Sequence, residues 1–495
     1  MMVNHDRGAL RRACALGPML AAAVFSATAA AAQDAAPAST EPTPYPRNAI
    51  GVGPVIGGYG EARWAEDWSG LRDPAKRKDF LDRLKYIPLS DDGEVWLSLS
   101  GEMRARTALT TSPGLSDGAD QRLDTLRLVG GADLRVGPHL RAYGELAHGG
   151  AGGRNMSRSI PALRNDLVVQ QAFVDVSAEV QGLELGARYG RQFFLDGSPY
   201  LISTRNGATI LTPYNGVRAW VRGERMRADL FDLRPTTLGV GGIDDDRTDR
   251  SRRFSGVTAG VLVPRDWFGG SRLHFDPFLW RHTQDARRWG AEVAHERRDY
   301  TGARLWGSAG SVNLDWTVAR QTGRYGDRRI DAWHVFTQQS FSVGEGASAP
   351  RVGLRFDYGS GGGAYDDGPL RNAVTPFGVP IFYSYQNVFN PVNMVVLAPS
   401  VTVRRGPTAL TAEVQATWRA STDDAVYRAT DLAYAGTEAV DGRHVGEVWK
   451  LQLAHTVSPR TSLIARYEHL AAGSVLKDAG YESSDYLTAW VSFRF

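Results

Sequence analysis

The feature that most constrains the fold is a strict alternation of side chains over the last ten residues. Apolar residues occupy one face, namely Leu487, Ala489, Val491, Phe493 and Phe495. The residues between them occupy the other face, namely Tyr486, Thr488, Trp490, Ser492 and Arg494. A period of two residues is that of a β-strand, and about 9–11 residues allow a strand to cross a bilayer. Residues 486–495 are therefore predicted to form a strand with one continuous apolar face.

The same alternation recurs along most of the chain. It is clearest over residues 95–106, 126–136, 140–146, 183–189, 410–419 and 463–468. The polar faces carry charges of both signs, whereas the apolar faces carry almost none. An arginine facing lipid near the middle of a membrane costs roughly 2–4 kcal/mol, and a slip of one residue would turn every charge that way. The charges are thus predicted to face a lumen. A soluble β-protein, whose strands also alternate, is the alternative.

In a membrane such a sheet must close, because backbone groups at an open strand edge find no hydrogen-bond partner in hydrocarbon. Residues 95–495 leave room for roughly 18 strands of ~10 residues each, with their turns and loops, and known barrels of this kind have 8–26. We therefore predict an all-β fold: a transmembrane antiparallel β-barrel of the bacterial outer membrane with about 18 strands.

The first 32 residues have the composition of a secretory signal peptide. A short basic stretch precedes an apolar run of mostly small residues that ends on Ala30-Ala31-Ala32. This is a cleavage pattern, so Gln33 is the expected start of the mature protein. A transmembrane anchor is the alternative, but the run is short and rich in alanine for a hydrocarbon core of ~30 Å.

The single cysteine, Cys14, lies inside the predicted signal peptide. Cleavage would leave a chain without disulfides or thiolate-bound zinc. We expect neither a cofactor nor a metal site.

Two segments precede the predicted barrel. Residues 33–60 are rich in Ala, Pro, Ser and Gly, a composition that cannot bury a core, so we predict a disordered or extended leader. Residues 61–94 are predicted to form an N-terminal segment in the periplasm, and the barrel is predicted to occupy residues 95–495.

The net charge of +3 is too small for a polybasic protein that binds nucleic acid. The kind of positive charge is more informative. Of 57 basic residues only five are lysines, at positions 76, 78, 85, 450 and 477. A genome rich in G and C would explain this bias. So would function, because guanidinium groups bind carboxylates through two parallel hydrogen bonds.

Three blocks of sequence, in order, carry a resemblance to a known family. The first block comprises residues 66–69, 71–74 and 84–89, ahead of a strand with Gly101-Glu102-Met103-Arg104. The second comprises Gln171-Ala172-Phe173-Val174-Asp175, Gly190-Arg191-Gln192, Arg205-Asn206-Gly207 and Tyr214-Asn215-Gly216-Val217-Arg218. The third comprises Ser421-Thr422-Asp423-Asp424, Tyr427-Arg428 and the final pair of strands. From about residue 60 to its end, the chain resembles the alginate-export family of outer-membrane porins.

The resemblance implies a single-chain barrel that exports an anionic polysaccharide through an arginine-rich constriction. A polyuronate carries one carboxylate per sugar, so arginines in the lumen could form a series of transient ion pairs that release their ligand. For any one arginine, an ion pair with a neighbouring Asp or Glu is the alternative role. The pore-lining candidates are Arg104, Arg127, Arg135, Arg141, Arg188, Arg191, Arg218, Arg355, Arg404 and Arg466.

Other functions remain as alternatives. Uptake of small organic solutes and a non-conducting structural or adhesin barrel both fit the strand pattern. An enzyme is not expected, because H-E-x-x-H does not occur and the ten histidines are scattered along the chain. The expected partners are an anionic polysaccharide or small anionic solute, outer-membrane lipid and lipopolysaccharide, the barrel assembly machinery and a periplasmic export complex. We expect a monomer and no nucleic acid.

Overall fold

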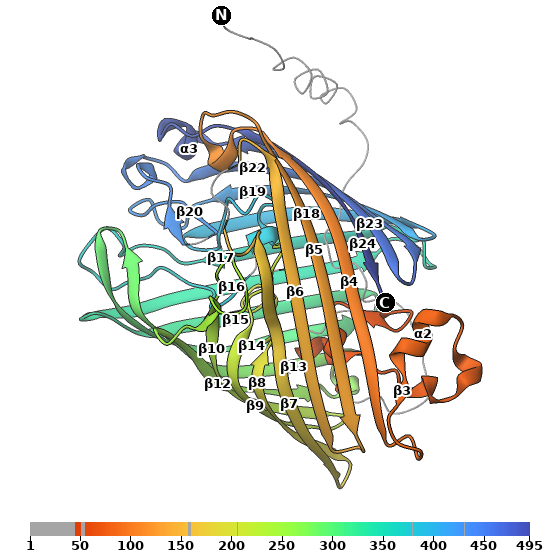
Figure 1. The fold of residues 1–495 in the computed structure, drawn as a ribbon. Coiled ribbons are helices and arrows are strands. Elements are labelled where there is room, and N and C mark those ends of the chain that lie inside the picture. Colours follow the sequence, from red (N-terminus) through yellow and green to blue (C-terminus); the bar gives the residue numbers. More distant parts are fainter. Residues whose placement is uncertain (1–44, 51–54, 157–159, 205, 379, 430) are drawn as a thin grey trace, which may run out of the picture.

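The computed structural model describes residues 45–50, 55–156, 160–204, 206–378, 380–429 and 431–495. Most of them form one closed antiparallel sheet, a barrel (Figure 1). In this described part of the chain, 18 strands make up the wall: β4 (Val95–Thr110), β5 (Gln121–Val136), β6 (Leu140–Arg154), β7 (Asn165–Val180), β8 (Leu183–Gln192), β9 (Tyr214–Arg222), β10 (Met226–Thr237), β12 (Arg252–Leu262), β13 (Arg272–Trp289), β14 (Glu292–Ala309), β15 (Val312–Tyr325), β16 (Arg328–Ser342), β17 (Arg351–Gly359), β18 (Met394–Arg405), β19 (Thr408–Trp418), β22 (His444–Ser458), β23 (Thr461–Ala472) and β24 (Ser484–Arg494).

Each wall strand pairs with the next one in sequence, and the ring closes where β24 pairs with β4. In that last pair, Trp490 lies opposite Arg106 and Phe493 lies opposite Met103. The prediction of an all-β, closed antiparallel barrel with about 18 strands is confirmed. Four two-residue strands add to it: β3 (Ile87–Pro88) and β11 (Arg247–Thr248) extend the sheet, while β20 (Tyr427–Arg428) pairs with β21 (Leu432–Ala433) between β19 and β22.

The two ends of the barrel differ in the length of their connections. At one end, Gly406-Pro407 joins β18 to β19, and Pro459-Arg460 joins β22 to β23. At the other end, residues 193–213, 360–393 and 419–443 form long loops. Short turns face the periplasm and longer loops face outward in bacterial barrels. The end with the short turns and the C-terminus is therefore the periplasmic end (Figure 1).

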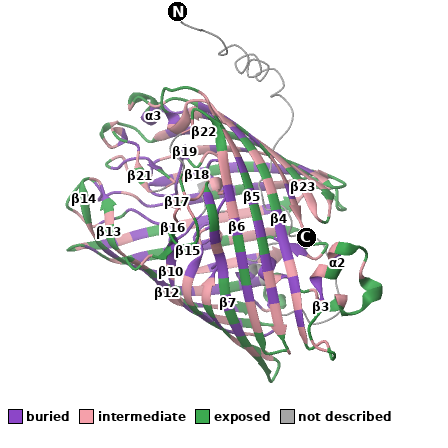
Figure 2. Cartoon of the chain, in the orientation of Figure 1, coloured by how far each residue is buried: buried purple, intermediate pink, exposed green. Residues whose placement is uncertain are grey.

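The two faces of the wall have the chemistry that the alternation predicts. On β5, Leu128 is 41% exposed, whereas its neighbour Arg127 is 3% exposed. Figure 2 shows this as bands of buried and exposed residues that alternate along β4, β5 and β6. Exposed leucine and valine side chains thus form the outer face, and charged side chains are buried inside. A soluble barrel would have the reverse arrangement.

Two long loops fold into the lumen and fill part of it. Phe377 donates its backbone N–H to the carbonyl of Leu201 over 2.9 Å, and an isolated bridge joins Ile202 to Phe377. Both segments contribute to a cluster of buried apolar side chains that includes Phe389. The loops fold inward because the lumen of an 18-strand barrel is too wide for the wall side chains alone to fill.

Short helical turns make up the rest of the described secondary structure. In the N-terminal segment they are η1 (Arg47–Ile50), η2 (Arg63–Ala65), η3 (Ser69–Arg72), η4 (Pro74–Lys76) and α2 (Phe80–Lys85), together with the strands β1 (Val55–Ile56) and β2 (Tyr59–Gly60). In the loops and turns they are η5 (Pro113–Leu115), η6 (Arg265–Phe268), η7 (Pro380–Phe382), η8 (Thr437–Ala439) and α3 (Ser474–Asp478). Among the described residues, no helix combines the length and the apolar character needed to cross a bilayer.

The N-terminal segment packs against the periplasmic end of the barrel. The carboxylate of Asp79 caps α2 by accepting from the N–H groups of Leu81 and Asp82. After α2, β3 pairs with β4 at Leu97 and Trp96, where β24 no longer reaches. The α2–β3 segment therefore lies beside the C-terminus (Figure 1).

The end of the predicted leader differs from the expectation of disorder. Residues 45–50 and 55–60 are ordered, and Tyr45, Ala49 and Tyr59 are buried. The average composition of the segment gives little weight to its tyrosines. The hydroxyl of Tyr45 donates to Asp276, and the hydroxyl of Tyr59 accepts from Arg460. The predicted signal peptide and the start of the leader, residues 33–44, lie outside the described residues.

Candidate functional site

The wall, the inward loops and the N-terminal segment enclose two large cavities. The first, which we call the arginine-lined cavity, has a volume of about 520 Å³ and lies against β4, β18, β19, β22, β23 and β24. The second cavity, of about 660 Å³, lies against the wall from β4 to β10. A cavity of about 40 Å³ lies where residues 61–64 meet Arg127 and the loop 193–213.

The arginine-lined cavity extends along most of the height of the wall. Its lining includes Pro407 and Pro459 in the periplasmic turns. It also includes Tyr486, which pairs with Thr110 at the opposite end of β4. The inward loops line it too, through residues such as Ser203 and Tyr385. A solute in this cavity would therefore contact the wall on one side and the loops on the other.

Positive charge dominates the lining. Six arginines line the cavity: Arg104, Arg106, Arg404, Arg460, Arg466 and Arg494. Glu61 is the one carboxylate among the described lining residues. Unpaired guanidinium groups between walls of low dielectric raise the local concentration of anions.

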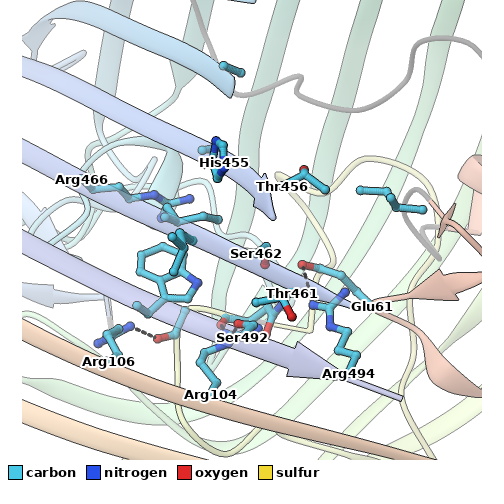
Figure 3. Close-up of a pocket in the computed structure, with 18 of the residues that line it drawn as sticks. Glu61, Arg104, Arg106, His455, Thr456, Thr461, Ser462, Arg466, Ser492 and Arg494 are labelled. Atoms are coloured by element: carbon cyan, nitrogen blue, oxygen red, sulfur yellow. Dashed lines mark hydrogen bonds and ion pairs between the residues drawn. The ribbon is translucent and has the colours of Figure 1, made fainter. Parts of the chain in front are cut away.

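Three of these arginines follow the same inward face of β4 and β24 (Figure 3). Arg104 pairs with Glu102, at 3.1 Å between Nη2 and Oε1. Arg494 lies 3.8 Å from Glu61 and 3.7 Å from Glu102. Arg106 donates only to the carbonyl of Gly207, over 2.7 Å, and its buried Nε has no hydrogen-bond partner among the described residues. Its positive charge is therefore not balanced by a carboxylate in direct contact.

Arg466, on β23, is held by aromatic rings and an amide. Its guanidinium carbon lies 4.6 Å from the centroid of Tyr385 and 4.9 Å from that of Trp490. Its Nε donates to the side-chain oxygen of Gln452 over 2.5 Å. Cation–π contacts fix the guanidinium without neutralising it. The group therefore stays available to an anion.

The remaining two arginines lie toward the periplasmic end. Arg404 forms no hydrogen bond or ion pair with another described residue. Arg460 donates to the hydroxyl of Tyr59 over 2.8 Å and pairs with Asp79 and Asp82. The hydrogen bond to Asp79 raises the pKa of Arg460 above its ordinary value. The same hydrogen bond lowers the pKa of Asp79.

The second cavity is electrostatically balanced. Arg135 and Arg141 both pair with Asp133, at 3.2 and 2.7 Å. Arg188 pairs with Asp175 at 2.7 Å, and its guanidinium stacks 3.6 Å from the centroid of Phe173. Each of the three predicted arginines here thus has a carboxylate partner.

The other four predicted arginines line neither of the two large cavities. Arg127 is buried and pairs with Glu102 at 3.2 Å. Arg218 pairs with Asp229 at 2.9 Å, and Arg355 contacts Glu413 at 3.0 Å. Arg191 donates to the carbonyl of Val169 and the side chain of Asn215.

The structure thus divides six of the predicted arginines between two cavities. Arg104, Arg404 and Arg466 line the arginine-lined cavity, whereas Arg135, Arg141 and Arg188 line the second cavity. Arg106 and Arg494 were missed as candidates, although the alternation places both on the inner face with Arg104. Arg460 lies in a turn, where no periodic signal exists.

Arg63, in the N-terminal segment, is a further functional candidate. It is buried, and its guanidinium joins Glu102 at 2.6 Å and Glu145 at 2.9 Å. Burial alone would lower the pKa of Arg63, but the charges of the two carboxylates outweigh burial and raise it well above its ordinary value. Elsewhere among the described residues, no group of three His, Cys, Asp or Glu side chains is placed to hold a metal ion.

Comparisons with known proteins agree with this architecture. A family model described as Alginate export matches residues 95–490. No curated protein matches the chain.

Solved structures share the fold. Acinetobacter baumannii OccAB1 is 12% identical, with 84% of this chain and 99% of that one covered and a TM-score of 0.53. Pseudomonas aeruginosa OccK5 (OpdH) is 12% identical, with 80% and 98% covered and a TM-score of 0.50. A BenF-like porin from Pseudomonas fluorescens Pf-5 is 12% identical, with 81% and 98% covered and a TM-score of 0.50. At these identities the similarity concerns the fold.

Proposed function

Because the chain belongs to the alginate export family and is a channel of the bacterial outer membrane, we propose that it exports an alginate-like polyuronate along its arginine-lined cavity. The observation that carries this proposal is the imbalance of charge in the lining, where six arginines face one carboxylate. A polyuronate presents a carboxylate on every sugar, and guanidinium groups bind carboxylates in a planar, two-bonded geometry.

The arrangement of the arginines favours passage of an anion over tight binding at one site. Arg106, Arg404 and Arg466 have no carboxylate partner among the described residues, so each can pair with a passing anion without first breaking an ion pair. Conduction requires several sites of moderate affinity. Three such groups spread over β4, β18 and β23 meet that requirement. The role proposed is passage of a solute, without covalent chemistry.

The proposal is tested in planar bilayers. Reversal potentials in a salt gradient should show preference for anions. The triple variant Arg106→Gln, Arg404→Gln, Arg466→Gln should shift the reversal potential toward cations. The shift should shrink at 1 M salt, where the Debye length is about 3 Å.

Arg405→Gln is the matched control for Arg404→Gln. The two residues are consecutive on β18, but Arg405 is exposed on the opposite face and does not line the cavity. Arg404→Gln alone should shift the reversal potential, and Arg405→Gln should leave it unchanged. Equal shifts for both variants would contradict a role of the arginine-lined cavity in anion preference.

Uptake of a small organic anion is the second candidate function, and one observation favours it. The inward loops leave an arginine-lined cavity of about 520 Å³, which is within the range of roughly 300–1,000 Å³ typical of small-ligand sites. Oligouronates of increasing length separate the two functions. Transient block of the current should strengthen with length for a polymer exporter and should reach its maximum at one or two sugars for a small-solute channel.

The proposed partners follow from the location. They are outer-membrane lipid and lipopolysaccharide on the apolar outer face, the barrel assembly machinery during folding, and an export complex at the periplasmic end. The chain closes its own ring of strands, so we propose that it acts as a monomer.

A further inference from the structure

The first part of the described N-terminal segment, before residue 69, crosses the periplasmic mouth, whereas α2 and β3 lie beside the C-terminus. At one side, the N–H of Tyr45 donates to the carbonyl of Gly223, in the turn between β9 and β10, over 3.0 Å. At the other side, Tyr59 accepts from Arg460, in the turn between β22 and β23. We call residues 45–50 and 55–68 the N-terminal bridge.

The two turns face one another across the barrel. Along the described wall, ten strands separate them in one direction, from β10 to β22, and eight in the other, from β23 through β4 to β9. Turns so nearly half a ring apart lie at opposite ends of a diameter. The bridge therefore spans the full width of the mouth.

Arg63 fixes the bridge to a third part of the wall. Its Nη1 lies 2.6 Å from Glu102 on β4, and its Nε lies 2.9 Å from Glu145 on β6. Glu145 also accepts from the hydroxyl of Tyr143 over 2.8 Å. The next residue, Trp64, lies 4.3 Å under the guanidinium of Arg188. Bidentate or shared guanidinium contacts of this kind are directional and resist displacement.

The first residues of the bridge are equally well held. The hydroxyl of Tyr45 donates to Asp276 over 2.5 Å, and the same carboxylate pairs with Arg227 at 3.0 Å. The carbonyl of Ala49 accepts from the N–H of Gly197 in the inward loop over 3.0 Å. The bridge is thus joined to the wall, to the periplasmic turns and to a loop from the opposite end of the barrel.

The two large cavities lie on opposite sides of this bridge. Ile56, Tyr59 and Glu61 line the arginine-lined cavity, whereas Tyr45, Ile50 and Trp64 line the second cavity. Where residues 61–64 meet the inward loop, a volume of only about 40 Å³ remains.

We propose that the N-terminal bridge divides the periplasmic mouth into two compartments and thereby sets the size of solute that can enter from the periplasm. It also confines that solute to one side, where the arginines lack carboxylate partners. The chemistry selected by the wall and the size selected by the bridge are then separate properties of one channel. This inference requires that the chain conducts solutes, as proposed above, but it does not depend on which anion is carried.

The test removes the bridge's charged anchor without leaving a buried charge unpaired. The double variant Arg63→Gln, Glu145→Gln keeps the net charge unchanged, and Glu102 retains Arg104 and Arg127 as partners. Neutral polyethylene glycols of increasing mass, added to the periplasmic side in planar bilayers, report the largest solute that enters. The variant should admit larger polymers than the wild type. Its conductance at 1 M salt should also rise, because the displaced bridge would no longer narrow the periplasmic mouth.

Arg83→Gln is the control, because Arg83 lies in the same N-terminal segment on α2 but is exposed. This variant should leave the size limit unchanged. Each variant is first checked for the folded barrel by its different electrophoretic mobility before and after boiling. If the double variant does not fold, Tyr45→Phe with Tyr59→Phe loosens both ends of the bridge and keeps the lumenal charges.

An unchanged size limit in a folded anchor variant would overturn the proposal. Because the polymers are neutral, this outcome is independent of anion preference. A wild-type channel without anion preference, together with an altered size limit in the anchor variant, would instead reject the polyuronate proposal and leave the bridge's role intact.

Discussion

The apolar outer face makes a quantitative prediction about depth in the membrane. Leu128 is the eighth of the 16 residues of β5 and is 41% exposed, so it faces lipid near the middle of the wall. Val136 is the last residue of the same strand, on the same face, and is 39% exposed. At about 3.3 Å per residue and a tilt of about 40°, the eight residues between them place Val136 about 20 Å from Leu128 along the membrane normal.

This separation exceeds half of the apolar band, which is about 25 Å tall in such barrels. Leu128→Arg should therefore lower the free energy of unfolding by roughly 2–4 kcal/mol, because the charge would lie at the midplane. Val136→Arg should lower it by only about 0–1 kcal/mol, because its guanidinium reaches the interface. Equilibrium unfolding in urea from lipid vesicles measures both values, with Leu128→Met as the control for lost packing.

Equal destabilisation by the two arginine variants would refute the reasoning. It would mean that the outer face of β5 does not experience a depth-dependent apolar medium. A harmless Leu128→Arg would be stronger evidence still, because it would imply that this face is in contact with water.

Two further predictions concern the ends of the chain. A Cβ atom at Gly101 would lie 2.3 Å from the ring of Phe495, so Gly101→Val and deletion of Phe495 should both reduce the heat-modifiable barrel in outer membranes, whereas Phe495→Tyr should preserve it. The pKa of Asp79 is lowered by its hydrogen bond to Arg460, so this contact stabilises the fold above the ordinary carboxyl pKa of 3.8 and the stabilisation is lost as pH falls further. Asp79→Asn should accordingly lower the thermal stability at pH 7, and the difference from wild type should shrink as the pH falls below 3.8. A difference that grows on acidification would contradict this assignment.

The faces of the strands were predictable because they depend on local sequence alone. Arg127 and Leu128 are neighbours on β5, and the period of two residues places one inside and the other outside whatever else the chain does. The same rule applies to Arg106 and Arg494, which were omitted from the candidates although it places them beside Arg104. Here the signal was present in the sequence.

The pairing of the arginines was not predictable, because it depends on contacts between distant parts of the chain. Arg355 on β17 contacts Glu413 on β19, and Arg63 contacts Glu145 on β6. The inward path of the loops is equally non-local. An arginine on the inner face is accessible to solute if no carboxylate lies close to it, and it forms a salt bridge if one does. The alternation fixes only the face.

The composition of the leader misled for a related reason. Proline, alanine and glycine argue against a core of its own. Tyr45 and Tyr59 are instead buried in a core that the barrel supplies. Disorder inferred from composition assumes an isolated segment, and the end of this one packs inside the barrel.

The distribution of ion pairs bears on how a wide barrel can be selective. Arg135, Arg141 and Arg188 each have a carboxylate within 3.2 Å, so their fields largely cancel at the distance of a passing solute. The uncancelled field comes from the wall with Arg106 and Arg466, where neutral groups hold the guanidinium in place of acids. Selectivity would then arise along one side of the lumen and not around a ring. An anion would travel in contact with that wall, with the N-terminal bridge and the inward loops keeping it there.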